Sequence, residues 1–327
     1  MKKTLVRWAV DAWYEDVLLG ILLLPFAYIF SNIVRLRRYL YRCGILKIYT
    51  LPVPVIVIGN ITVGGTGKTP LIICLAELLI NAGYKPGIIS RGYGGKSEIW
   101  PQIVTEHSGA SKVGDEALLI AKQTRLPVVV SPSRVDAAKK LLDKFDCNVL
   151  LSDDGLQHYK LNRDIEIAVI DGERRFGNGY CLPAGPLREP ISRLSSVDFI
   201  VVNGNKYEDN EFSMQLVGDT VINLSTGELR PLQAFREISC HALAGIGNPD
   251  RFFKLLESAG LLWCTTHSFP DHHPFSRNDI EFGDNKPVLM TEKDAVKCTD
   301  FAGENHWYVP VKAVPEPVLG QQLLDLL

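Results

Sequence analysis

The stretch TVGGTGKT, residues 62–69, decides the fold of this 327-residue chain. It follows PVPVIVI (52–58), whose β-branched residues predict a short buried strand. It runs into LIICLAELLINAG (71–83), which predicts a helix that opens at Lys68 and ends near Gly83. A strand, a glycine-rich turn and a helix in this order form the setting of a phosphate-binding loop.

The residues of this loop suit the β- and γ-phosphates of a nucleoside triphosphate. Glycines let backbone N–H groups converge on phosphate oxygens, and the helix adds the positive end of its dipole. We expect Lys68 to reach the phosphates and the Thr69 hydroxyl to help hold Mg²⁺. The strict pattern has glycine where this chain has Thr62, but the glycine pair that follows can supply the backbone freedom. The predicted nucleotide-binding residues are Thr62, Val63, Gly64, Gly65, Thr66, Gly67, Lys68 and Thr69.

Two adjacent aspartates, Asp153 and Asp154, follow a hydrophobic strand predicted at 147–152. Carboxylates at the end of a buried strand beside the phosphate loop are where such proteins hold Mg²⁺. Two neighbouring negative charges next to a polyanion also need a cation to neutralise them. A polar strand end capped by a turn is the alternative, and the pattern favours a metal site.

Other polar motifs also admit a purely structural interpretation. Asp115 fits the N-cap of the helix that follows it, and Glu116 fits an acid in the first helical turn. The segment TEKD (291–294) after the strand PVLM fits a capping box. Three loops carry charged or aromatic residues, and loops are where such residues usually act. They are SRGYGG (90–95), PAGPLRE (183–189) and FPDHHPF (269–275).

Charge and cysteine content argue against several classes of protein. The net charge of −2 disfavours a nucleic-acid binder that relies on phosphate attraction. Eight Lys and Arg against three Asp and Glu give residues 1–50 a charge of +5, which leaves −7 for the rest of the chain. The basic, apolar front therefore indicates a membrane-facing end. The seven cysteines are scattered without C-x-x-C spacing, so we expect no disulfide framework, no zinc site and a reducing cytosol.

The most hydrophobic run is VLLGILLLPFAYIF (17–30). As a helix it reaches about 21 Å, short of the roughly 30 Å hydrocarbon core of a bilayer. Extension to residue 34 gives only a borderline length, and Pro25 interrupts the middle. Three acidic residues at 11–16 directly precede the run, which makes a secretory signal a poor fit.

This segment can lie at the membrane interface, be buried on the main domain, or span the membrane. Spanning would carry Lys2, Lys3 and Arg7 to the far side, against the positive-inside tendency. The interfacial placement is favoured, because it puts aromatic and basic side chains at the lipid headgroups. These side chains are Trp8, Trp13, Tyr14, Arg35, Arg37 and Arg38.

Taken together, the motifs resemble those of one family, the tetraacyldisaccharide 4′-kinases (lipid A 4′-kinases) of Gram-negative envelope synthesis. They run from the phosphate loop almost to the C-terminus, and the apolar N-terminal helix is similar too. The matching segments are GNITVGGTGKTP (59–70), SRGYGG (90–95), GDE (114–116), DDGLQH (153–158), DGERRFGNG (171–179), LPAGPLRE (182–189), FPDHH (269–273) and TEKDAVK (291–297).

The resemblance implies transfer of the ATP γ-phosphate to the 4′-hydroxyl of a tetraacylated glucosamine disaccharide 1-phosphate. It implies that Asp115 and His272 form a dyad that accepts or orients the hydroxyl proton. It gives Arg188, beside Lys68, the role of stabilising charge on the transferring phosphoryl group. The implied Mg²⁺ residues are Asp153, Asp154, Thr69 and Glu116.

The same resemblance implies substrate contacts, cofactors and a location. Contacts to the disaccharide or its 1-phosphate are expected from Arg91, Tyr93, Arg134, His158 and Glu189. ATP and Mg²⁺ are the expected cofactors and the lipid A precursor the expected partner, with no nucleic acid and no inferable protein partner. Because extracting acyl chains costs about 0.8 kcal/mol per buried CH₂, we expect a peripheral or monotopic enzyme on the cytoplasmic face of the inner membrane.

The pattern predicts an α/β fold: a doubly wound P-loop sheet with a second, smaller α/β domain and an N-terminal membrane-associated helix. The expected boundaries are 1–50 for the membrane-docking segment, 51–203 for the P-loop kinase domain, 204–223 for a linker with strands and 224–327 for the smaller domain. The loops FPDHH and TEKD are expected to face the cleft between the two domains.

Two other functions stay open on sequence grounds. A P-loop kinase of a soluble sugar or cofactor would leave the apolar N-terminus unexplained. A membrane-recruited ATPase switch usually has lysine just before the paired glycines of the loop, where this chain has Val63. The N-K-x-D guanine signature is also missing from VVNGNK (201–206), because Gly204 follows the asparagine.

Overall fold

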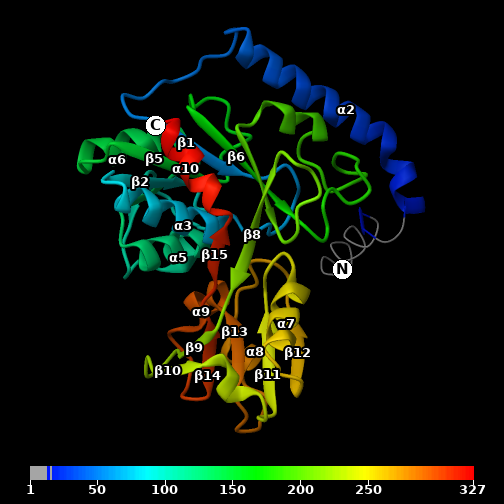
Figure 1. Ribbon diagram of the computed structural model, residues 1–327, viewed down its shortest axis with the longest axis vertical. Coiled ribbons are helices and arrows are strands. Elements are labelled where there is room, and N and C mark those ends of the chain that lie inside the picture. The colour runs from blue at the N-terminus through cyan, green and yellow to red at the C-terminus, as the bar shows by residue number, and fades with distance from the viewer. Residues whose placement is uncertain (1–12, 15–16) are drawn as a thin grey trace.

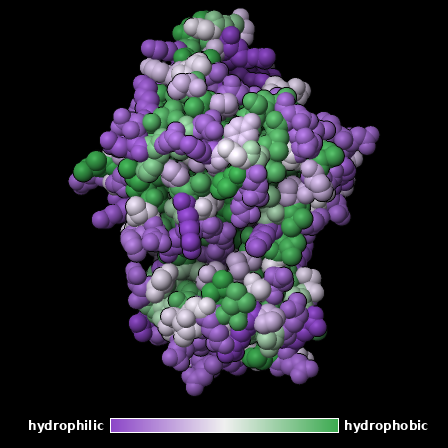
Figure 2. Space-filling model, turned by 60° about the vertical axis from the view of Figure 1, so that its left-hand side comes forward, coloured by the Kyte–Doolittle hydropathy of each residue, from purple (hydrophilic) through white to green (hydrophobic). Residues whose placement is uncertain are grey.

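The computed structural model describes residues 13–14 and 17–327, without the side chains of 17–19 (Figure 1). Predictions that concern residues 1–12 and 15–16 lie outside the described residues. Figure 1 shows two α/β units, with helix α2 (Val17–Arg42) along the outer edge of the larger one. In the space-filling view of Figure 2 the outline narrows to a waist where the two units meet.

The larger unit is built on a sheet with nine strands among the described residues, in the order β15-β8-β7-β6-β1-β5-β2-β4-β3. The interior strands run parallel, and the two edge strands β15 and β3 are antiparallel to their neighbours. The strands are β1 (Val55–Gly59), β2 (Pro86–Ser90), β3 (Gln102–Val104), β4 (Val128–Val130), β5 (Val149–Asp153), β6 (Ile165–Asp171), β7 (Phe199–Asn203), β8 (Glu211–Val217) and β15 (Lys312–Pro315).

Helices cover both faces of this sheet because alternate residues of β1 point to opposite sides. Ile56 and Ile58 pack against the helices of one face, and Val55 and Val57 against the other. The first face carries α3 (Lys68–Asn81), α5 (Asp115–Thr124) and α10 (Pro317–Asp325), and the second carries α6 (Arg134–Lys144). The predicted doubly wound α/β fold is confirmed.

The smaller unit has six described strands in the order β10-β9-β14-β13-β11-β12. They are β9 (Thr220–Asn223), β10 (Leu229–Pro231), β11 (Cys240–Ala244), β12 (Cys264–Ser268), β13 (Val288–Thr291) and β14 (His306–Val309). Phe252 of α7 (Pro249–Ser258) packs on one face and Ala295 of α9 (Glu292–Cys298) on the other. Other short helices are α4 (Ala110–Val113), α8 (Arg277–Ile280), η1 (Ile191–Ser196) and η2 (Leu232–Phe235).

Two segments lie elsewhere than their expected domains. The segment 204–223, expected to be a linker, supplies β8 to the first sheet and β9 to the second. The end of the chain leaves the smaller unit, since β15 pairs with β8 and α10 packs on α3. Leu319 and Leu323 of α10 are fully buried in the core of the larger unit, which explains the return.

Helix α2 is longer than the apolar run that predicted it. Its 26 residues span about 39 Å, and the helix continues through Pro25 and the basic residues at 35–42. The stretch Gly20–Arg42 is long and apolar enough to cross a membrane by length and composition, and only 11% of its most apolar window is buried. The alternative of a helix buried on the main domain is therefore wrong for this segment.

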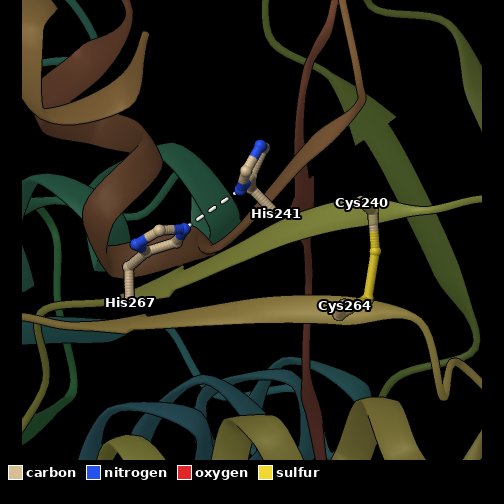
Figure 3. The surroundings of a disulfide bond; sticks show 4 residues. All are labelled: Cys240, His241, Cys264 and His267. Atoms are coloured by element: carbon tan, nitrogen blue, oxygen red, sulfur yellow. Dashed lines mark hydrogen bonds between the residues drawn. A yellow bond between two sulfur atoms is a disulfide. The ribbon is translucent and has the colours of Figure 1, made fainter. Parts of the chain in front are cut away.

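The smaller unit contains a disulfide between Cys240 and Cys264 (Figure 3). The scattered cysteines predicted no disulfide framework, and this single disulfide was not predicted. The two residues are 24 positions apart and meet only because β11 pairs in parallel with β12, which their spacing does not reveal. On the opposite face of these strands, Nδ1 of His241 lies 3.0 Å from Nε2 of His267. The free cysteines are Cys43, Cys74, Cys147, Cys181 and Cys298.

Candidate active site

The phosphate loop joins the end of β1 to the start of α3. Gly64 and Gly67 have φ values of 104° and 98°, which favour glycine. A Cβ at Gly67 would also lie 2.5 Å from Nδ2 of Asn203, which donates a hydrogen bond of 3.1 Å to the carbonyl of Thr66. Asn203 at the end of β7 thus helps to fix the shape of the phosphate loop.

The loop PAGPLRE holds the phosphate loop from another side. The N–H of Val63 donates to the carbonyl of Pro186 at 2.8 Å, and the N–H of Arg188 donates to the carbonyl of Ile61 at 2.7 Å. Between these two hydrogen bonds, Thr62 forms an isolated antiparallel bridge with Leu187. Thr62 is thus extended backbone, so this position does not need glycine, and the bridge brings Arg188 beside the nucleotide loop.

Asp154 is the counter-ion of two cations at this site. Its Oδ1 lies 3.5 Å from Nζ of Lys68, and its Oδ2 accepts a hydrogen bond of 2.9 Å from Arg188. Burial opposes ionisation of Asp154, but the charges of Lys68 and Arg188 outweigh it and hold its pKa well below the usual range. Both cations are therefore gathered where phosphate oxygens can replace the carboxylate.

Asp153 has the opposite surroundings. Its Oδ2 accepts a hydrogen bond of 2.8 Å from Oγ of Ser90, whereas its buried Oδ1 has no partner among the described residues. Burial, followed by the negative charges of Glu116 and Asp154, raises its pKa to about 6. A cation at Oδ1 would relieve both effects, so the residue fits a Mg²⁺ ligand.

No group of three His, Cys, Asp or Glu within the described part of the chain is arranged to hold a metal. Asp154 is occupied by two cations, and Oε1 of Glu116 accepts a hydrogen bond of 2.9 Å from Lys293. This agrees with Mg²⁺ chemistry, because the ion is usually held by one or two carboxylates and the substrate phosphates. Asp153 is the carboxylate best placed for it.

Asp115 and His272 come from different units and meet at the waist. Asp115 is the first residue of α5, and His272 lies in the loop after β12. Nδ1 of His272 lies 3.0 Å from both carboxylate oxygens of Asp115. The N-cap interpretation of Asp115 is wrong, since Gly114 holds the cap position, where a Cβ would lie 2.6 Å from the carbonyl of Tyr93.

The pair is strongly polarised. Burial opposes the charge of Asp115, but the hydrogen bond from His272 and the cations Lys293 and Lys297 outweigh it and lower its pKa to about 2. Burial opposes the charge of His272 as well, and the hydrogen bond to Asp115 still raises its pKa. An ionised carboxylate that fixes an imidazole is an arrangement that can orient and accept a proton.

Comparison with known proteins shows the family of this chain. Residues 19–327 match the family model described as tetraacyldisaccharide-1-P 4′-kinase. The chain is 52% identical to the tetraacyldisaccharide 4′-kinase of Nitrosococcus oceani over 96% of this chain and 93% of the relative, and 51% identical to that of Actinobacillus succinogenes over 97% of each. The chain belongs to the tetraacyldisaccharide 4′-kinase family.

A solved structure of this family superposes closely on the chain. The crystal structure of the "apo" form of LpxK from Aquifex aeolicus in complex with ATP aligns with a TM-score of 0.79 and 32% identity. The alignment covers 94% of this chain and 99% of the other. The resemblance and the fold class predicted from the motifs are confirmed, and so is the assignment to an ATP-dependent kinase.

Lys293 of this kinase was missed as a site residue by sequence reasoning. Its Nζ lies 2.9 Å from Glu116, 3.0 Å from Asp271 and 3.5 Å from Nε2 of His272. The capping interpretation of TEKD holds for Thr291, whose side chain accepts the N–H of Asp294 at 3.2 Å. The presence of TEKDAVK among the family motifs was the signal that could have singled out Lys293.

The five residues predicted to contact the substrate differ in how far they are exposed to solvent. Arg91 and Tyr93 are exposed in the loop after β2, and the Tyr93 ring lies 4.9 Å from the His272 ring. Arg134 is only 2% exposed and donates to the carbonyl of Asp153 at 2.7 Å, so it positions the aspartate pair instead of facing the open site.

Glu189 also differs from the expectation. It is buried, and its carboxylate accepts hydrogen bonds from Gln157 and Tyr159, so it supports neighbouring residues and is closed to a substrate. His158 is half-buried, and burial together with the charge of Arg134 lowers its pKa to about 4, which keeps the imidazole neutral.

Proposed function

We propose that this kinase transfers the γ-phosphate of ATP to the 4′-hydroxyl of a tetraacylated glucosamine disaccharide 1-phosphate, the lipid A precursor, at the cytoplasmic surface of the inner membrane. The observation that carries the proposal is the Asp115–His272 pair. One unit supplies the phosphate loop and the carboxylate, and the other supplies the imidazole that fixes it. Membership of the tetraacyldisaccharide 4′-kinase family supports the acceptor.

On the donor side, Lys68 and Arg188 carry the electrostatic role. Both cations lie on Asp154 and can turn to the β- and γ-phosphate oxygens when ATP enters. Charge that develops on the transferring phosphoryl group is then stabilised by groups already in place. Asp153 and Thr69 would hold Mg²⁺, which when bound neutralises charge on the phosphates.

On the acceptor side, Asp115 orients the 4′-hydroxyl. Its pKa of about 2 makes it a weak base, so it serves mainly to place the hydroxyl in line with the γ-phosphate. Proton loss becomes favourable as the new P–O bond forms, and the dyad of Asp115 and His272 then takes the proton. Closure of the two units about this pair would exclude water, which competes as an acceptor.

Helix α2 is the part of the kinase that docks on the membrane surface. The exposed apolar side chains of the helix, which we call the docking face, are Ile21, Leu22, Phe26, Ile29, Ile33 and Leu36. On the other side of the helix, a groove of about 420 Å³ lies between α2 and residues 179–192. An apolar face of this size, followed by basic residues in the last turns, suits an interfacial helix on anionic lipid.

The direct test is incubation with labelled ATP and the lipid A precursor in micelles, with the phosphorylated position read by mass spectrometry. We expect phosphate at the 4′ position, and Lys68→Ala should lose at least about 10²-fold in turnover. Phosphate elsewhere on the sugar would overturn the assignment.

A deacylated disaccharide separates this function from its two rivals. Full activity without acyl chains would favour a kinase of soluble sugars. ATP hydrolysis with no transfer to either acceptor would favour an ATPase switch. We expect the acylated acceptor to be strongly preferred, because its lipid chains keep it at the surface where α2 docks.

A further inference from the structure

Tyr159 connects helix α2 to a buried acid near the phosphate loop. Its ring lies 5.8 Å from the ring of Tyr41 and 5.9 Å from the guanidinium carbon of Arg37, both on α2. Its hydroxyl donates a hydrogen bond to Oε2 of Glu189, which is 1% exposed. Through one side chain, the docking helix therefore reaches the residue that follows Arg188 in the chain.

From Glu189 the contacts continue into the phosphate loop. Oε1 of Glu189 accepts a hydrogen bond of 2.8 Å from Nε2 of Gln157, which also donates to the carbonyl of Asn60 at 3.0 Å. The fully buried side chain of Asn60 donates to the carbonyl of Gly64 at 3.2 Å. Gln157 and Asn60 thus join Glu189 to a glycine whose positive φ shapes the loop.

The carboxylate of Glu189 is held firmly enough to transmit position. Nε of the buried Arg193 lies 3.5 Å from its Oε2, and Arg193 is fixed in turn by Glu166. Burial, followed by the charge of Glu189, raises the pKa of Tyr159, so the hydroxyl keeps the proton that it donates. Inside the protein an unpaired polar group is costly, so movement of one member of this chain of contacts displaces the next.

We propose that Tyr159, Glu189 and Gln157 are positioning residues that couple the seating of α2 on the larger unit to the geometry of the phosphate loop. With α2 seated, the Tyr41 ring and the Arg37 guanidinium pack on Tyr159 in addition to Arg163 and Arg193 of the larger unit, and its hydroxyl holds Glu189. Loss of the α2 contacts leaves the Tyr159 ring with Arg163 and Arg193 alone, so its position loosens and the support of Asn60 and Gly64 weakens with it. The inference rests on the proposed function only for the role of α2 at the membrane, because the coupling itself concerns ATP.

The test measures MgATP affinity of the full chain in detergent micelles, without acceptor lipid. Tyr159→Phe keeps the ring and removes the hydroxyl, which should raise the dissociation constant about tenfold through the lost bond to a carboxylate. Arg37→Ala removes a cation–π contact on α2 and should raise it about threefold to fivefold. Tyr39→Ala is the matched control on the same helix, since this side chain is 60% exposed and outside the contacts above.

The double variant separates coupling from two independent losses. If α2 acts through Tyr159, adding Arg37→Ala to Tyr159→Phe should leave the effect near tenfold, whereas independent effects multiply to about thirtyfold to fiftyfold. Multiplication, or an Arg37→Ala chain as tight as the Tyr39→Ala control, would overturn the proposal. So would a Tyr159→Phe chain with a lower Tm but unchanged ATP affinity and kcat, because its role would then be structural only. Failure of the proposed function would appear separately, as absent phosphorylation of the lipid by the unaltered chain.

Discussion

At the residue scale, Asp153 and Asp154 show that two identical side chains can have opposite pKa shifts because their surroundings differ. Burial and neighbouring acids raise the pKa of Asp153 to about 6, while Lys68 and Arg188 hold that of Asp154 far below its usual range. Asp154 therefore pairs with two cations, whereas the buried Oδ1 of Asp153 has no hydrogen-bond partner among the described residues. Adjacent residues differ in this way because consecutive side chains at a strand end point in different directions.

The raised pKa of Asp153 makes a prediction about stability. Its folded pKa lies above that of the unfolded chain, so the ionised form costs on the order of 3 kcal/mol above pH 6, and the cost vanishes below about pH 4. Asp153→Asn should therefore raise the free energy of unfolding by about this amount at pH 7.5 without Mg²⁺, while activity is lost. Denaturant titrations at pH 7.5 and pH 4.5 check this, and a difference that grows toward acid pH would contradict it.

Asp115→Ala should lower kcat by about 10²-fold to 10³-fold with a modest change in KM, since the lost interaction matters mainly in the transition state. Asp115→Asn is the matched variant, because an amide keeps a hydrogen bond to His272 and lacks the charge. Steady-state kinetics on both variants provide the measurement. A raised KM with unchanged kcat would instead make Asp115 a residue of substrate binding.

Individual site residues differ in how far the sequence predicts them. Lys68 and Thr69 follow from a local pattern, because strand, loop and helix are contiguous. Asp115 and His272 are 157 positions apart and meet only through the docking of two sheets, so only a family resemblance could pair them. Arg134 and Glu189 were expected to face the substrate. Both are buried and instead support neighbouring residues of the site, and burial of this kind cannot be inferred from the spacing of residues in the sequence.

At the scale of elements, α2 differs from every other described helix in its exposure. Its apolar side chains face outward, with Leu22 at 76% exposed, whereas the apolar residues of α3 are largely inside the core. Hydrophobic residues exposed along one helix mark a surface that another phase or partner covers. The sequence predicted such a helix but ended it too early, because the pattern of apolar residues stops before the helix does.

Deletion of residues 1–35 should release the kinase from membranes, because most of the docking face and most of α2 are removed. We expect binding to vesicles containing anionic lipid to fall at least about tenfold in a flotation assay. Leu22→Glu with Phe26→Glu is a milder variant that keeps the helix and charges its docking face. Unchanged flotation of both variants would show that another surface anchors the protein.

At the scale of the whole molecule, the smaller unit is inserted between β8 and β15 of the larger sheet. Pairing of these distant strands was invisible to local patterns, which is why the end of the chain was expected in the smaller domain. The two crossings near residues 217–220 and 309–312 are the covalent links between the units. Any movement of the smaller unit, which carries His272, relative to the phosphate loop must therefore bend the chain at these two links.

Leu323→Ala should destabilise the larger unit although the residue lies near the end of the chain. The side chain is fully buried in the core beneath α3, and such truncations cost about 2–5 kcal/mol. Leu326→Ala, 57% exposed at the end of the same helix, is the matched control and should change stability by less than about 0.5 kcal/mol. Equal effects of the two substitutions in chemical denaturation would show that α10 is not part of this core.

Because β15 and α10 at the end of the chain pack into the larger unit, this unit cannot be completed until the last described segments have been synthesised. These segments leave the ribosome after all the other described segments, whereas α2 is among the first to emerge. The helix can therefore find lipid while the nucleotide sheet still lacks an edge strand and a covering helix. If α2 docks on the membrane as proposed, a nascent chain reaches the surface that holds its lipid acceptor before the part that binds ATP is complete.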